Sequence, residues 1–220
     1  MLRIKTTDSA PFFHDAITPV RRSLARLYRI GMIPLLSSLL VLAPAVSGWS
    51  QTERYPTNDE IDFLLQQTRR DMPRLLETGI YHDRRTSEER QQRDAFVAAW
   101  AEVNALVAPF LGGWSAIEET TYIFPTARTG EVCIIDMDAA SSRFSSGRVT
   151  DNKVYTDLNL VLALDSGFLS SIAVYDGEAN AYQYANPRPL IDPVISPVGE
   201  SYPAMVEQFQ AAGCLTRTPE

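Results

Sequence analysis

Two aspartates spaced two residues apart are the first group in this chain that could do chemistry. Asp136 and Asp138 lie in the stretch 131–138, which alternates as a β-strand does, so both carboxylates should project from one face. Paired carboxylates can act as general acid and base or bind a hard cation. The spacing does not match an EF-hand loop, and sequence shows neither the separation nor the raised pKa that glycoside hydrolysis needs. A polar strand face in contact with solvent is the alternative interpretation.

A single histidine, His82, follows the N-terminal apolar segment and stands close to Arg84 and Arg85. One imidazole excludes sites that need two histidine ligands, so we expect no metal centre and no cofactor. His82 is a candidate acid-base group, and an exposed turn histidine is the alternative. Ser115 lacks the closing glycine of a nucleophile elbow, and an attack by Cys133 would need a reduced thiol. We therefore interpret the chain as more a binding protein than an enzyme.

Three tyrosines flank a predicted turn at Asp176-Gly177. On an antiparallel strand pair, Tyr175, Tyr182 and Tyr184 should form an aromatic patch next to amide side chains. Rings beside amides are suited to binding a sugar or a peptide. Cross-strand stabilisation of an exposed sheet face is the alternative.

Arginines are concentrated between residues 69 and 93, where seven arginines face five acids, whereas the stretch 94–220 has a net charge of −10. Arg84 and Arg85 should lie in the turn of a helical pair. They are candidates for docking to an anionic membrane surface or an acidic partner. Ion pairs within a solvated helical pair are the alternative.

The first 48 residues have the pattern of an export signal. Four arginines between residues 21 and 29 precede the apolar run Ile30 to Val46, and small residues follow it. A cleaved signal peptide is favoured, with an uncleaved N-terminal anchor and a buried core helix as alternatives. In either of the first two cases the remaining chain is exported and works in the periplasm or outside the cell.

Removing the leader leaves 172 residues with 14 basic and 25 acidic side chains, a formal charge of −11. This length suits one domain, and the negative charge makes a nucleic-acid partner unfavourable. Its two cysteines, Cys133 and Cys214, predict a disulfide that closes a loop of about eighty residues. Two buried reduced thiols are the alternative. The remaining partner classes are an envelope protein, a glycan and an anionic membrane surface.

The elements that should position these residues begin after a linker at 49–56. Capping boxes at 57–60 and 86–89 predict two helices, ended near Gly79 and at Gly112-Gly113, which should pack as a hairpin. Alternating segments then predict about five strands, with a proline-rich connector and a last helix after them. These strands are expected at 122–125, 131–138, 158–164, 168–175 and 181–184.

The expected fold is therefore a single α+β domain over residues 57–220. It has an N-terminal helical hairpin, an antiparallel β-meander of about five strands and a C-terminal helix. The expected function is that of an exported cell-envelope binding or accessory protein without an evident catalytic site. A secreted hydrolase or isomerase that uses carboxylates, and a self-assembling structural domain, are the alternatives.

Overall fold

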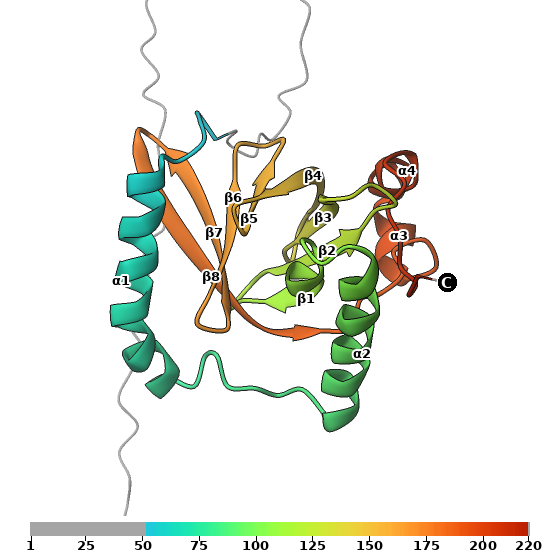
Figure 1. The fold of residues 1–220 in the computed structure, drawn as a ribbon, viewed down its shortest axis with the longest axis horizontal. Helices are drawn as coiled ribbons and strands as arrows, with labels where there is room; N and C mark the ends of the chain where they lie inside the picture. The colour runs from blue at the N-terminus through green and yellow to red at the C-terminus, as the bar shows by residue number, and fades with distance from the viewer. Residues whose placement is uncertain (1–51, 220) are drawn as a thin grey trace, which may run out of the picture. The chain divides into compact units, whose positions relative to one another are not determined.

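Eight antiparallel strands close into a barrel in the computed structural model, which describes residues 52–219 (Figure 1). Each strand pairs with the next one along the chain, and β8 returns to pair with β1. The strands are β1 (Gly112–Ser115), β2 (Thr120–Pro125), β3 (Glu131–Met137), β4 (Ser142–Thr150), β5 (Lys153–Thr156), β6 (Val161–Asp165), β7 (Phe168–Tyr175) and β8 (Glu178–Arg188).

The predicted fold class was wrong in its arrangement. The chain does combine helices with an antiparallel sheet, but the sheet has eight strands and no free edge strand within the barrel. β1, β4 and β5 were missed. Gly112-Gly113 belongs to β1 and does not end a helix. A Cβ at Gly113 would lie 2.6 Å from the Tyr122 ring of β2. Strand packing thus requires a residue without a Cβ at position 113.

The N-terminal helices lie apart and form no hairpin (Figure 1). α1 (Asn58–Glu77) packs on the outside of the barrel, where Ile61 and Leu65 contact Val161 and Ile172. α2 (Ser87–Val103) lies on another side of the barrel, and an extended connector joins the two helices. α1 thus covers part of the outer face of the sheet, whereas α2 contributes Trp100 to the cluster inside the barrel.

Both predicted helix starts are confirmed, since Thr57 and Thr86 each form a complete capping box. The predicted end of the second helix was wrong. α2 ends at Val103 because Asn104 leaves the helical conformation and uses its side chain elsewhere. Its Nδ2 donates to the carbonyl of Arg128, and its Oδ1 accepts from the amide of Gly130.

One end of the barrel interior is filled. The short 3-10 helix η1 (Ala108–Phe110) follows α2, and Phe110 and Trp100 join the inward-facing side chains of the strands in one buried cluster. Trp114 of β1 completes this cluster and donates its indole N–H to the carbonyl of Phe110. The turns 151–152 and 166–167 surround this filled end.

The last helices, α3 (Pro197–Ser201) and α4 (Pro203–Ala211), cover the outer face of β2 to β4. Phe209 packs edge-on against Phe124 there, with ring centroids 4.8 Å apart. Cys214 follows α4 and forms a disulfide with Cys133 of β3, which confirms the predicted pairing. The bond fastens the C-terminal segment to the barrel wall.

The predicted leader at 1–48, including the apolar run Ile30 to Val46, lies outside the described residues. The chain divides into two units, and the described residues all belong to the second, Ala45–Glu220. Within residues 52–219, no helix has the length and apolar character needed to cross a membrane.

Candidate functional site

The other end of the barrel contains a cavity of about 290 Å³. The turns 116–119, 138–141, 157–160 and 176–177 surround this end, which we call the mouth. The cavity is lined from four strands, β3, β4, β7 and β8, and from the adjoining turn residues Glu119 and Leu160. It lies above the apolar cluster that fills the opposite end. Eight-stranded barrels have room for one small ligand in such a position.

An ion pair between neighbouring strands lies in the cavity wall. Asp136 Oδ2 is 3.2 Å from Arg143 Nη2, and the two side chains are 16% and 22% exposed. Asp136 Oδ1 accepts a hydrogen bond of 2.8 Å from the hydroxyl of Thr121. The antiparallel register places these three residues opposite one another on β2, β3 and β4, all facing the interior. Charges at this depth are stable only when they are paired and hydrogen-bonded.

A second polar contact joins β8 to the β1–β2 turn at the mouth. The phenol of Tyr184 donates to Glu119 Oε2 over 2.7 Å, although the Tyr184 side chain is only 4% exposed. Burial, reinforced by the nearby Asp136 carboxylate, raises the pKa of Tyr184 above its ordinary value. Tyr184 is therefore a neutral donor that holds the Glu119 carboxylate at the rim of the cavity.

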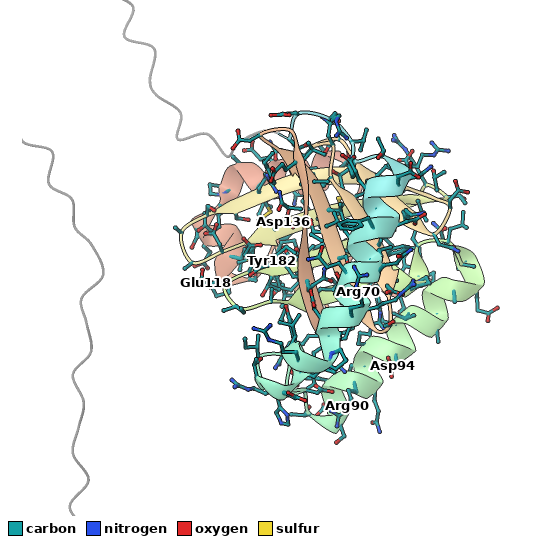
Figure 2. The ribbon with its side chains drawn as sticks, turned by 90° about the vertical axis from the view of Figure 1, so that its left-hand side faces the viewer. Arg70, Arg90, Asp94, Glu118, Asp136 and Tyr182 are labelled. Carbon is teal, nitrogen blue, oxygen red and sulfur yellow. A yellow bond between two sulfur atoms is a disulfide. The ribbon has the colours of Figure 1, made fainter. Side chains whose placement is uncertain are left out.

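Aromatic rings form another part of the wall. Tyr182 and Tyr184 meet nearly at right angles, with centroids 5.3 Å apart and an interplanar angle of 77°. Tyr175 at the end of β7 also lines the cavity. Tyr182 and Tyr175 remain 40% and 36% exposed, so their rings are accessible from the solvent. Figure 2 shows Tyr182 and Asp136 on the same side of α1, with Glu118 of the β1–β2 turn near them.

The rest of the lining is small or apolar. Leu160 and Ala173 contribute apolar surface, while Ser171 and Asn180 add polar groups. A small molecule in this cavity would meet rings and methyl groups on some sides and a few fixed polar atoms on others. This combination is typical of binding sites for small molecules.

The two candidate aspartates have different roles. Asp136 faces the barrel interior, whereas Asp138 is taken up by the β3–β4 turn. Asp138 Oδ1 accepts from the amides of Ala140 and Ser141, and Oδ2 accepts from the Ser141 hydroxyl over 2.7 Å. These hydrogen bonds lower the pKa of Asp138, chiefly through the Ser141 hydroxyl. The structure thus leaves one aspartate of the predicted pair in the cavity.

The three tyrosines are together, but not on an exposed sheet face. Tyr175, Tyr182 and Tyr184 all point toward the mouth, as their contact with one cavity shows. The neighbouring amides separate from them. Gln183 points outward to bond Ser170 and Thr68, while Asn180 stays with the rings.

His82, Arg84 and Arg85 lie in the connector between α1 and α2, beside a different hollow of about 340 Å³. Arg85 is held by a two-point contact with Asp83 and donates to the carbonyl of Pro187 over 2.9 Å. The side-chain hydrogen bond from Arg85 lowers the pKa of Asp83 below its usual range. These residues do not form the tip of a helical pair, and the structure does not bring them into the mouth.

Three site residues were missed from the sequence: Arg143, Thr121 and Glu119. Arg143 belongs to β4, which was not predicted, so its position opposite Asp136 could not be derived. Residues 142–150 show no alternation of apolar and polar residues, because the inward positions Ser145 and Gly147 are small and Phe144 packs on the outer face. Among residues 52–219, no three His, Cys, Asp or Glu side chains group in a way that could hold a metal ion.

Comparison with protein-family models, with curated proteins and with the solved structures finds no match to this chain.

Proposed function

We propose that this chain is an exported binding protein that holds one small molecule in the mouth of its barrel. The observation that carries the proposal is the cavity of about 290 Å³, whose wall contains the Asp136–Arg143 ion pair and the accessible rings of Tyr175 and Tyr182. A volume of this size is at the lower end of the range for ligand sites, so the ligand is small.

The organisation of the polar atoms supports binding over acid-base catalysis. Asp136 is engaged on both oxygens, by Thr121 and by Arg143. Its hydrogen bonds fix the carboxylate in place before a ligand arrives, and fixed polar groups lower the entropy cost of binding. A carboxylate held in this way orients a ligand. The export part of the proposal rests on the arginine-rich leader and on the Cys133–Cys214 disulfide, which suits an oxidising compartment.

The experiment is a calorimetric titration of the purified full-length chain with a defined set of probes. The set consists of choline chloride, N-acetylglucosamine and sodium acetate, which represent a cation, a neutral sugar and an anion. We expect saturable binding of at least one probe. We also expect Ala173→Leu, which fills the cavity, to weaken that binding at least about tenfold.

The matched control is Ala127→Leu, because Ala127 is exposed in the β2–β3 loop at the filled end. Thermal unfolding establishes that both variants are folded, and Tyr182→Leu replaces Ala173→Leu if the extra methyl groups prevent folding. Binding that is equal in the mouth variant and the control would refute the proposal, as would the absence of binding by all three probes.

A further inference from the structure

The mouth carries more negative than positive charge. Its cavity is lined by two carboxylates, Asp136 and Glu119, and by one guanidinium, that of Arg143. Arg143 already faces Asp136 at 3.2 Å, so the Glu119 carboxylate is not balanced by a cation lining the cavity. Its contact is the neutral phenol of Tyr184. Glu118, which precedes Glu119 in the turn, is exposed and adds a further negative charge at the rim.

The negative charge at the mouth affects the pKa of two of the tyrosines. Burial raises the pKa of Tyr182 and the charge of Glu119 raises it further, whereas hydrogen bonds with the backbone of Glu118 and Ile117 act in the opposite direction. The Asp136 charge acts in the same direction on the pKa of Tyr184. A field that makes a phenolate less stable makes a bound cation more stable, because the sign of the charge is reversed.

The aromatic rings add a contact that is favourable for cations. The nearly perpendicular rings of Tyr182 and Tyr184 form a corner, and Tyr175 lines the same cavity. An organic ammonium group is attracted by the negative face of an aromatic ring, by about 0.5–2 kcal/mol depending on desolvation. A methylated ammonium group can contact the rings in this way, and its methyl groups can also contact the apolar part of the wall.

We propose that the mouth is selective for a small organic cation of the ammonium class, a refinement that rests on the proposed binding function. An anion would approach two carboxylates and one guanidinium that is already paired. A neutral sugar would use the rings and amides but gain nothing from the excess negative charge. A bare metal ion would lack ligands, since the described residues hold no group of three carboxylate, imidazole or thiol side chains.

The test compares choline with its uncharged carbon isostere, 3,3-dimethylbutan-1-ol, in calorimetric titrations of the full-length chain at low salt. The two probes have nearly the same shape, so a difference in affinity reports the charge. We expect choline to bind at least about tenfold more tightly than the isostere, and this preference to shrink in 0.5 M salt.

Two mouth variants locate the selectivity. Glu119→Gln should weaken choline binding about tenfold and leave isostere binding unchanged. Tyr182→Leu should weaken choline binding about fivefold while it keeps an apolar wall. The matched control is Asp151→Asn in the β4–β5 turn at the filled end, which removes the same charge and suits the positive φ of 49° at that position.

Equal affinities for choline and the isostere would overturn cation selectivity, and so would a choline affinity that Glu119→Gln does not change. Tighter binding of N-acetylglucosamine or acetate than of choline in the mouth would also overturn it while leaving the binding function intact. No binding of any of these probes in the mouth would overturn both proposals.

Discussion

Asp136 and Arg143 face each other inside the barrel, with Oδ2 and Nη2 3.2 Å apart on neighbouring strands. The pair is mostly shielded from solvent, and its carboxylate is also bonded to Thr121. Asp136 and Arg143 therefore affect both the stability of the barrel, through their ion pair, and the cavity, which both side chains line.

Replacing Arg143 by Met should therefore destabilise the fold, since it leaves the Asp136 carboxylate in the barrel wall without its cation. We expect the free energy of unfolding in urea to fall by about 2–4 kcal/mol. Arg148→Met is the matched control, because Arg148 is on the same strand but 71% exposed and lies 3.8 Å from Glu131. Its loss should be within about 1 kcal/mol. Equal effects of the two substitutions would contradict this account of the ion pair.

The disulfide should contribute to stability by restricting the unfolded chain. Cys133 and Cys214 are 81 residues apart in sequence, so their bond closes a long loop. We expect the double variant Cys133→Ala/Cys214→Ala to lose about 2–5 kcal/mol of unfolding free energy. The unsubstituted chain in reducing buffer should lose a similar amount. An unfolding midpoint that is unchanged by reduction would be inconsistent with the bond.

The side chain of Asn104 should stabilise the filled end of the barrel. It is 5% exposed, ends α2 and bonds the β2–β3 loop through the backbone of Arg128 and Gly130. Asn104→Ala leaves buried polar groups unpaired and should lower the unfolding free energy by about 1–3 kcal/mol. Gln92→Ala, on the exposed face of α2, should change it by less than about 0.5 kcal/mol. An unfolding free energy that Asn104→Ala leaves unchanged would show that these hydrogen bonds do not contribute to stability.

Acid should loosen the start of α1. The side-chain hydrogen bond from Arg54, supported by the Thr57 backbone, lowers the pKa of Glu60 from its ordinary value of 4.5 to about 2. A lowered carboxyl pKa stabilises the folded state above the ordinary value, and this contribution is lost as pH falls from about 4.5 to about 2. The difference in urea midpoint between the unsubstituted chain and Glu60→Gln should be constant above this window and shrink within it. A difference independent of pH from 6 to 2.5 would contradict the assignment.

The parts of the fold that were predicted correctly depend on neighbours in sequence. The capping boxes at Thr57 and Thr86 involve residues three positions apart, so their signal is complete within one helical turn. The strand 168–175 was predicted at its observed bounds because its apolar residues are bounded by turn residues on both sides. The disulfide is an exception, since Cys133 and Cys214 are 81 residues apart and were paired because the sequence holds no other cysteine.

The parts that were missed depend on contacts between distant residues. Closure of the barrel rests on β1 pairing with β8, about seventy positions away, and β1 has a glycine pair that resembles a helix end. Gly147 is a residue type that usually interrupts a strand, yet it lies within β4 and faces the interior. A glycine is needed there because a Cβ would lie 2.5 Å from Val154. In the same way, the sequence around Asp136 is compatible with a solvent-exposed carboxylate. Only the pairing of β3 with β4 places Arg143 opposite it.

The candidate site was predicted in part for the same reason. Asp136 and the tyrosines 175, 182 and 184 were singled out by type, and the structure brings all four into one cavity. Sequence spacing placed them on two unrelated faces. Only the curvature of the closed sheet joins the end of β3 to the β7–β8 turn.

The most direct test of the central claim is to map where a small molecule binds. Amide shifts in a nuclear magnetic resonance titration of the full-length chain with choline, N-acetylglucosamine and acetate, each added separately, report the position of the contact. A ligand in the mouth should move amides of the turns 116–119, 138–141 and 176–177 and leave those of 151–152 and 166–167 unchanged. If none of the three probes moves the mouth amides, or if the shifts concentrate at the filled end, the barrel mouth is not the binding site and the account is wrong.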